Sequence, residues 1–502
     1  MRLFFAHFRA LTAPQETPRH GTFPAVLHYS ALYVNIAGRG FPPVGYLPYA
    51  RLLAYVFSLL GVRDVSALPS KSIARELIGF SLPLILSGVL QQLYNWVDAF
   101  IVGHVEGELA MGAVGATTAA VNLFLTAIIG FTLGLNVLMA QRHGAGEDER
   151  LPRLLGSFSF ALGGVFLLIG ALGVFFAGEL LELLDTTADM LPLSEGYLSI
   201  VFTGMPFLAV YNVYSAALRA LGDSRAPFLA VAVSSGVNVA LDILLVAVIP
   251  WGVRGAAIAT VISQIAMTVF MVSYAVRKYP ILRFRPGRAL FSGGQLREGA
   301  SFGFPPMIQS CVSALGSMLL QSYMNSFGND TVTAITTAYR VDTIILLPMI
   351  NLGSAISTLT AQSHGAGDDV RAAKILNVGC LLMAAVSLVL TGIIIPTGGY
   401  LIAMFGAGET VVGIGSSFFA CIAPFYIIYG LSMAVRGHLE GLGRMVYSSA
   451  VGIAALALRI AASYALRSVF WNMTIAYAEA FSWVLMLLLY TLKLLLMRRR
   501  HK

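Results

Sequence analysis

The feature that most limits the fold of this chain is a series of long apolar stretches. From about residue 78 onward, runs of roughly 20 apolar residues recur, each the length that a helix needs to cross the hydrocarbon core of a bilayer. Only 11% of the 502 residues are charged, less than half the share that is usual in a soluble chain. The pattern predicts an all-α polytopic membrane protein with twelve transmembrane helices, near residues 78–103, 112–140, 154–177, 193–219, 227–249, 254–276, 298–323, 331–360, 372–395, 409–435, 446–466 and 475–497.

The basic residues fall between alternate stretches. Most of the 32 lysines and arginines lie on one predicted side of the membrane, whereas the opposite side holds Arg254 and Arg467. Because basic loops stay in the cytoplasm, we expect a multi-pass protein of the cell membrane with both termini inside. Short basic loops between apolar runs suit a lipid bilayer as the partner and argue against nucleic acid.

One phrase is written twice in the chain, 221 positions apart. "AQRHGAGEDE" begins at Ala140 and "AQSHGAGDD" begins at Ala361, and each closes one apolar stretch and opens the next. As turns, they predict structural roles for His143 and His364 at a helix end, where a cation suits the helix dipole. They also predict a left-handed glycine in each turn and an acid that caps the next helix: Gly144 or Gly146, Gly365 or Gly367, Asp148, and Asp368 or Asp369.

The duplication also predicts the domain organisation. The most basic loop, residues 277–299, separates the sixth stretch from the seventh. With six helices each, both halves enter and leave on the same side of the membrane, as parallel transporter repeats do. We expect two pseudo-symmetric six-helix lobes. The expected parts are a poorly ordered N-terminal extension (1–70), an N-lobe (71–282), a C-lobe (283–497) and a basic cytoplasmic tail (498–502).

Several segments together resemble a known transporter family. "LPLILSGVLQQLYNWVDAFIVGH", "AVGATTA" and "AQRHGAG" are similar to the first half of the multidrug and toxic compound extrusion (MATE) transporters, and "RVDTIILLPMINLGSAISTLTAQSHGAG" to the second. "GVNVALDILLV" and "GVRGAAIATVISQ" resemble the fifth and sixth spans of that family. The resemblance covers roughly residues 75–497. It implies two lobes in a V, a central cavity, and export driven by inward flow of H⁺ or Na⁺.

Two carboxyl groups lie inside predicted spans of the N-lobe. Asp98 shares a helix face with Gln91 and Asn95, and Asp242 follows Asn238 by one helical turn. A charge at the bilayer centre costs about 2.5–3.5 kcal/mol by insertion scales, so each such group is expected either to have a function or to join two helices by a hydrogen bond. Two desolvated carboxyls close together favour a protonated form, which proton coupling requires. The resemblance also assigns Asp98 and Asp242 to the acidic positions of the N-lobe and Asn238 to their amide neighbour.

The C-lobe also carries charges inside its predicted spans. Arg340 and Asp342 lie two residues apart in the eighth span and so do not face each other, while Tyr339 shares a face with Asp342. These three residues are interpreted either as part of a structural ion-pair network or as part of a cation-attracting cavity. Arg459 and Glu479 are candidates for an ion pair between the eleventh and twelfth spans.

The coupling ion is expected to be H⁺. The seventh span has no acid, where the resemblance implies one in Na⁺-coupled members. Asp98, Asn238 and Asp242 nevertheless offer several oxygen ligands, so a Na⁺ site at these residues is the alternative. No other metal site and no cofactor are expected.

The motifs argue against an enzyme as the alternative class of protein. The chain has no Gly-Lys dipeptide and therefore no P-loop, and its G-x-S-x-G at 299–303 opens a helix instead of joining a strand to one. We therefore expect a secondary active multidrug efflux antiporter. It would export amphipathic organic cations in exchange for H⁺, or alternatively Na⁺, by alternating access, as a monomer. The other reading is a flippase or exporter of a lipid-linked or other endogenous metabolite in the same superfamily, the multidrug/oligosaccharidyl-lipid/polysaccharide exporters.

Overall fold

The computed structural model describes residues 71–283 and 293–500, and no strand occurs among them. The chain divides into one compact unit at Pro69–Tyr490 and another made of Met1–Leu68 and Thr491–Lys502. Of the second unit, the structure describes the last turns of α18, which continue to Arg500. The expected N-terminal extension, residues 1–70, lies outside the described residues.

The helices of the first half, α4–α10, form the N-lobe. Six of its segments correspond to the six predicted spans, with α9 and the π-helical η2 forming the fifth. The elements are α4 (Lys71–Glu106), α5 (Glu108–Gly144), η1 (Asp148–Arg150), α6 (Leu151–Phe175), α7 (Ala177–Leu183), α8 (Leu191–Ala220), α9 (Arg225–Asp242), η2 (Ile243–Val248), α10 (Gly252–Lys278) and η3 (Pro280–Leu282).

The second half, α11–α18, forms the C-lobe. Its tenth span is divided among α14, η5 and α15. The elements are α11 (Gly293–Asn325), α12 (Asn329–Gly365), α13 (Asp369–Ala403), α14 (Glu409–Ile422), η5 (Ala423–Phe425), α15 (Tyr426–Gly441), α16 (Met445–Ala465), α17 (Arg467–Phe470), η6 (Trp471–Met473) and α18 (Thr474–Arg500).

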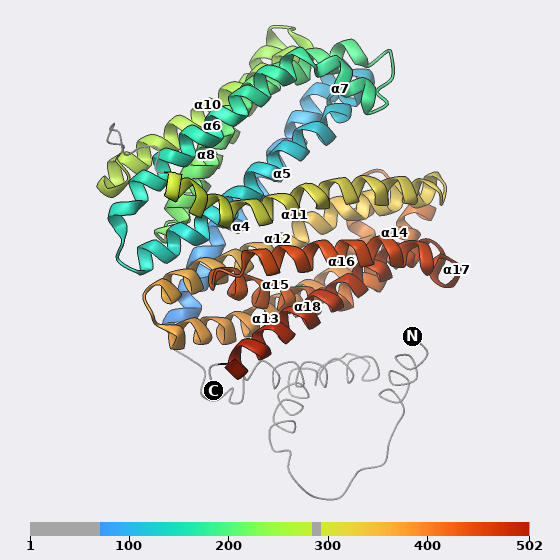
Figure 1. The fold of residues 1–502 in the computed structure, drawn as a ribbon. Coiled ribbons are helices and arrows are strands. Elements are labelled where there is room, and N and C mark those ends of the chain that lie inside the picture. Colours follow the sequence, from blue (N-terminus) through green and yellow to red (C-terminus); the bar gives the residue numbers. More distant parts are fainter. Residues whose placement is uncertain (1–70, 284–292, 501–502) are drawn as a thin grey trace, which may run out of the picture. The chain divides into compact units, whose positions relative to one another are not determined.

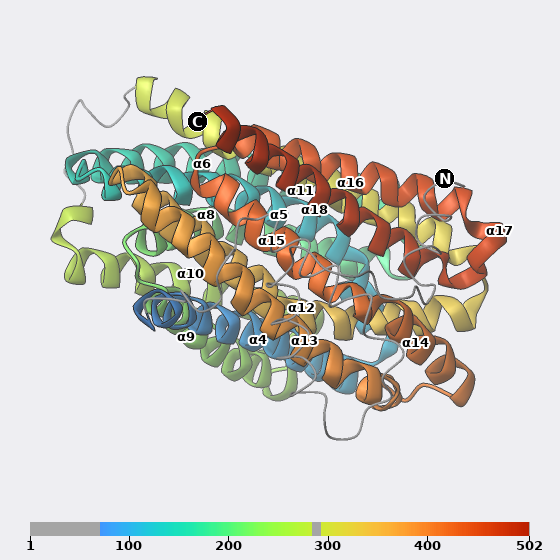
Figure 2. The same ribbon diagram turned by 90° about the horizontal axis from the view of Figure 1, so that it is seen from below.

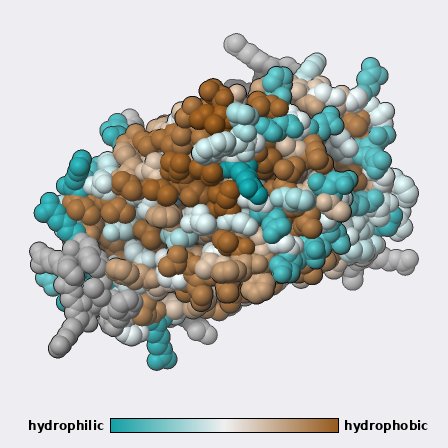
Figure 3. Space-filling view, turned by 90° about the horizontal axis from the view of Figure 1, so that it is seen from above, coloured by the Kyte–Doolittle hydropathy of each residue, from teal (hydrophilic) through white to brown (hydrophobic). Residues whose placement is uncertain are grey.

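The spans have the length and apolarity that a bilayer requires. Within the described part of the chain, eleven helical segments are long and apolar enough to cross a membrane. The twelfth, α11, is also long, but Pro305, Pro306 and Gln309 interrupt its apolar stretch. Large apolar side chains point outward, and Phe175 is 80% exposed. Figure 3 shows apolar side chains covering much of one face, with hydrophilic ones gathered toward its edges, as expected of a surface in contact with lipid.

The backbone repeats itself at the interval that the sequence predicted. Four residues of the N-lobe have positive φ and a counterpart with positive φ 221 positions later: Gly107 and Gly328, Gly146 and Gly367, Asp185 and Gly406, Gly222 and Gly443. Seven of these eight residues are glycine, which adopts positive φ without steric cost, and the eighth is Asp185. The two lobes are therefore parallel repeats of one six-helix unit. In the repeated phrases, Gly146 and Gly367 are the left-handed residues, and Gly144 and Gly365 remain helical.

Within Pro69–Tyr490, the two lobes meet along α4, α5, α11 and α12. Figure 1 shows the N-lobe helices and the C-lobe helices converging toward one end and separating toward the other. In Figure 2, α4 lies between α9 of its own lobe and α12 of the other, and it packs against both. Two glycines let α5 approach α11 closely: a Cβ on Gly134 would lie 1.9 Å from the Phe302 carbonyl oxygen, and one on Gly130 would lie 2.7 Å from that of Pro306.

The convergent end carries the turns 145–147, 221–224, 366–368 and 442–444, which basic residues flank. We call it the basic end, and the opposite one the far end. At the far end the lobes also touch through α4, because the Trp96 ring packs edge-on against Phe405, with ring centroids 5.8 Å apart.

Candidate ion-coupling site

The two intramembrane carboxyls of the N-lobe come together where α4 packs against α9. Asp242 is fully buried and Asp98 is partly buried, and the two carboxyl groups are direct neighbours. Within the described part of the chain, no donor reaches Asp98 Oδ1 or either carboxyl oxygen of Asp242. A carboxyl pair without donors is strongly unfavourable when both groups are charged, whereas one shared proton supplies the missing hydrogen bond. The geometry suits a site that binds and releases a cation.

Asp242 is the last residue of α9 before the helix widens. The following six residues, Ile243–Val248, form the π-helical segment η2. A π-helical turn is rare and is often found at functional sites, because it shifts the register of the side chains on either side. Here it begins directly after the carboxyl, so the face that carries Asp242 is set by the local widening. Sequence periodicity alone gave no sign of this segment.

Two tyrosines complete the surroundings of the carboxyl pair. Tyr94 on α4 lies near Asp98, Asp242 and Gln91. Tyr197 on α8 lies near the same pair and near Thr260 of α10. Tyr94 precedes Asp98 by four residues, so a helical-face search would have found it. Tyr197 comes from another helix and carries no sequence signal.

The other predicted members of this site lie at different depths. Asn238 is buried one turn before Asp242, and its side-chain oxygen has no donor among the described residues. Gln91 and Asn95 are exposed, and the Asn95 amide donates to Gln92 Oε1 at 3.4 Å. Gly88, on the same stripe of α4, touches Leu347 of α12. The polar stripe of α4 therefore runs along the side of the helix that meets the C-lobe.

In the C-lobe, Tyr339 and Asp342 belong to a buried network. Glu479 Oε2 accepts hydrogen bonds from the Tyr339 hydroxyl and from Arg459 Nη2, both at 3.0 Å. Asp342 Oδ1 accepts a hydrogen bond from the Tyr426 hydroxyl. The candidate pairing of Arg459 with Glu479 is thus confirmed, and it neutralises both charges inside the lobe. This network differs from the N-lobe pair because each of its acids has a donor.

Arg340 does not join this network. Asp342 is 3% exposed, whereas Arg340 lies on an exposed face of α12. Arg340 precedes Leu347 by seven residues, which places both on one stripe of the helix. Leu347 contacts α4, so Arg340 continues the stripe of α12 that faces the N-lobe, two turns nearer the far end. Of the two interpretations, the ion-pair network suits Tyr339 and Asp342, and a position facing the other lobe suits Arg340.

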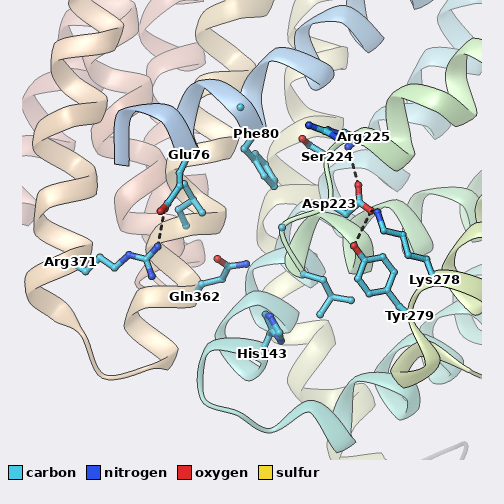
Figure 4. A pocket seen from close by; sticks show the side chains of 14 residues that line it. Glu76, Phe80, His143, Asp223, Ser224, Arg225, Lys278, Tyr279, Gln362 and Arg371 are labelled. Atoms are coloured by element: carbon cyan, nitrogen blue, oxygen red, sulfur yellow. Dashed lines mark hydrogen bonds and ion pairs between the residues drawn. The ribbon is translucent and has the colours of Figure 1, made fainter. Parts of the chain in front are cut away.

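A separate cavity of about 620 Å³ opens at the basic end (Figure 4). On one wall, Asp223 accepts hydrogen bonds from Lys278 and Tyr279, each at 2.9 Å, and from the backbone N–H groups of Arg225 and Ala226. Burial opposes the charge of Asp223, but these donors outweigh it and hold the pKa of the carboxyl below its usual range. On the opposite wall, Arg371 pairs with Glu76, as the dashed line in Figure 4 shows. Every acid here has partners, so the cavity differs from the Asp98–Asp242 site.

The predictions for the repeated turns are partly confirmed. His143 Nδ1 lies 2.7 Å from Asp148, and His364 Nδ1 lies 3.0 Å from Asp369, so both histidines are held within their own turns. Asp368 caps α13 by accepting from the Arg371 backbone N–H at 2.8 Å. The expected cap by Asp148 was wrong, because that carboxyl binds His143 instead and caps no helix.

The comparisons with known proteins agree with this architecture. A model of the MatE family matches residues 83–244 and 305–465, one segment in each lobe. The chain belongs to the MatE family. It is a family of transporters, and the chain is an integral multi-pass membrane protein. The resemblance seen in the sequence is thereby confirmed.

Individual relatives extend the similarity over most of the chain. The probable multidrug resistance protein YpnP of Bacillus subtilis is 30% identical over 378 residues, which are 75% of this chain and 84% of YpnP. The probable multidrug resistance protein NorM of Thermotoga maritima is 25% identical over 387 residues, covering 74% of this chain and 80% of NorM. A multidrug resistance MATE family transporter in an outward-facing conformation shares the fold, with a TM-score of 0.77 at 18% identity, covering 86% of this chain and 96% of that one.

Proposed function

We propose that this MatE-family protein is a secondary active multidrug efflux antiporter that exports amphipathic organic cations in exchange for H⁺. The observation that carries the proposal is the Asp98–Asp242 pair, two neighbouring carboxyls that lack donors beside a polar helix stripe facing the other lobe. The relatives named as multidrug resistance proteins support the substrate class. The exchange needs no enzymatic chemistry and no cofactor.

The proposed orientation follows from charge. Arg142, Arg225, Arg371 and Arg444 flank the turns of the basic end, so by the positive-inside rule this end faces the cytoplasm. The chain then lies in the cell membrane with both termini inside. We propose that the monomer is the working unit.

The proposed cycle uses one site for two competing cations. With the far end open, Asp98 and Asp242 take up protons from outside, and the loss of negative charge weakens the attraction for a cationic substrate. Substrate leaves, the lobes rock, and the basic end opens. There the protons leave and the carboxylates attract a new organic cation. Tyr94 and Tyr197 keep the pair in a polar but largely dry setting.

The test is transport in proteoliposomes under imposed ion gradients. Efflux of a fluorescent organic cation driven by a pH gradient should fall at least tenfold in Asp98→Asn and Asp242→Asn. Asp189→Asn is the matched control, because Asp189 is an exposed acid of the same lobe, outside the spans. Full H⁺-driven efflux in both variants would refute the coupling role of the pair. Efflux that follows only a Na⁺ gradient, and is lost in Asn238→Ala, would assign Na⁺ to these residues instead.

A further inference from the structure

The two copies of the repeated phrase touch each other across the lobe interface. Gly144, at the end of α5, faces the backbone carbonyl of Gln362, and an added Cβ would lie 2.0 Å from that oxygen. Gly365, at the end of α12, faces the carbonyl of Gln141 with the same 2.0 Å spacing. Each glycine is therefore required by the other copy of the phrase. The sequence had predicted these glycines for a left-handed turn, whereas here they allow the two lobes to approach closely.

The glutamines of the two phrases bind the opposite lobe in the same way. Gln141 Nε2 donates to the Gly441 carbonyl at 2.7 Å, and Gln362 Nε2 donates to the Ala220 carbonyl at 2.8 Å. Ala220 and Gly441 are the last residues of α8 and α15, and they too are 221 positions apart. Each amide satisfies a carbonyl that its own helix leaves without a partner. The two contacts are thus related by the pseudo-symmetry of the fold.

Two ion pairs also join the lobes at the rim, at positions that the 221-residue offset does not relate. Arg142 of the N-lobe binds Glu298 in the first helix of the C-lobe. Arg371 of the C-lobe binds Glu76 in the first helix of the N-lobe at 2.8 Å. All four side chains are 26–42% exposed. Both pairs join the lobes, and Figure 4 shows the Glu76–Arg371 pair beside Gln362 at the cavity of the basic end.

We propose that these contacts form a reciprocal latch, made of the glutamines 141 and 362, the glycines 144 and 365 and the two ion pairs, which opens and recloses once in every transport cycle. The latch rests on the proposed function, since alternating access requires the basic end to part. Gln141 and Gln362 are its positioning residues. They act on the equilibrium between lobe arrangements and do not touch the transported ion.

The chemistry of the contacts suits reversible opening. The latch consists of polar side chains, backbone carbonyls and exposed ion pairs beside a cavity that water reaches. When the lobes part at these contacts, water replaces each polar partner, so breaking the latch itself exchanges hydrogen bonds. Because the two halves are equivalent, removing either glutamine should loosen the closed state to the same extent.

The test measures the separation of the lobes at the basic end. Spin labels are attached at Glu149→Cys and Lys374→Cys, two exposed positions of opposite lobes, with Cys311, Cys380 and Cys421 replaced by alanine. Pulsed electron paramagnetic resonance in lipid nanodiscs should show a short distance between the labels when the basic end is closed and a long one when it is open. Gln141→Ala and Gln362→Ala should each raise the ratio of long to short about fivefold, the change expected for one net hydrogen bond. The double variant should raise it about 25-fold, since the two bonds are separate.

Asn212→Ala is the matched control. It also removes an amide that donates to a carbonyl at 2.8 Å, but within α8, so the ratio should not change. The proposal is overturned if both glutamine variants behave like this control, or if the labels never separate at any pH or substrate concentration.

A cross-link separates the latch from the transport proposal. In a chain without the spin-label cysteines, a bis-methanethiosulfonate reagent should bridge Glu76→Cys and Arg371→Cys through two disulfides and stop efflux, and a reductant, by cleaving both disulfides, should restore efflux. Continued efflux with the bridge in place would overturn the latch. A chain whose labels respond as expected, but which moves no organic cation in either direction, would contradict the proposed function and leave the latch supported.

Discussion

Adding one methyl group at Gly144 or Gly365 should drive the transporter toward the state with its basic end open. Both glycines are helical, so alanine meets no backbone strain at either position. The added Cβ would lie 2.0 Å from a backbone carbonyl oxygen of the other lobe, where ordinary contact needs more than 3 Å. The obstacle is backbone, which cannot rotate away as a side chain can. The lobes must therefore move apart locally by over 1 Å whenever the basic end closes.

The energetic effect follows from that overlap. Overpacking a closely packed contact by one methyl group costs about 1–3 kcal/mol. The clash exists only in the closed arrangement, so nearly the whole cost is added to the free-energy difference between the closed and the open basic end. It corresponds to a shift of about 5- to 150-fold toward the open basic end. Inside a helix, alanine is also more favourable than glycine by about 0.5–1 kcal/mol, so neither variant should unfold the protein.

The assay is the distance between labels at positions 149 and 374, measured together with the melting temperature. Gly144→Ala and Gly365→Ala should each enlarge the long-distance population, and transport should slow because the outward-open state becomes rare. Gly115→Ala is the control in the same helix as Gly144, because nothing lies within 4 Å of its added Cβ. A closed population in Gly144→Ala equal to that of Gly115→Ala would refute the reasoning, and so would a fall in melting temperature without a change in distance.

Three further predictions concern charges outside the N-lobe pair. Glu479→Gln leaves Arg459 unpaired in a buried site and should lower the free energy of unfolding by about 3–5 kcal/mol, whereas Arg459→Met with Glu479→Met should recover most of the loss in melting temperature. Arg340→Gln should leave the melting temperature unchanged and lower the KM for a monocationic substrate several-fold, because a repelling charge facing α4 is removed. Asp223→Asn should cost about 2–3 kcal/mol, since the carboxylate accepts charge-assisted hydrogen bonds. Because the pKa of Asp223 is lowered in the fold, its contribution is complete above the unfolded value of about 3.9 and disappears as the pH falls through the folded value, which hydrogen exchange at residues 221–226 can follow.

The sequence could predict the spans because lipid imposes a simple rule on composition. Every apolar run of sufficient length became a helical span, and the fold follows from their number and the duplication. The limits of the helices were harder to place: α4 begins at Lys71 and ends at Glu106, beyond the apolar run at both ends. Hydropathy indicates which residues contact lipid, whereas a helix continues until its backbone hydrogen bonds are interrupted, so its ends can lie outside the apolar run.

The candidate site could be predicted in part. A charged residue inside an apolar run can be recognised from the sequence alone, so Asp98 and Asp242 were predicted as candidates. The groups around them were not, because Tyr197 reaches the pair from a different helix, and tyrosines are common in membrane helices. Gln141 and Gln362 were quoted as part of the repeated phrase, yet nothing in the sequence says that one copy packs on the other. That relation appears only when the two lobes are placed together.

The two lobes share their turns but differ in their buried charges. Turns depend on glycine at fixed positions, and those positions kept their 221-residue spacing. The buried charges did not: Asn238 in the N-lobe corresponds to Arg459 in the C-lobe, and Asp242 corresponds to Ser463. In the C-lobe, Arg459 is paired with Glu479, and Asp342 accepts a hydrogen bond from the Tyr426 hydroxyl, so both acids already have partners. The N-lobe has an amide at the equivalent position, so its carboxyl pair has no fixed cation there, as the proposed exchange of a mobile ion requires. The prediction that follows is directional: Asn238→Arg should fill the N-lobe site with a fixed cation, abolish efflux under any ion gradient, and leave the basic end able to open and close.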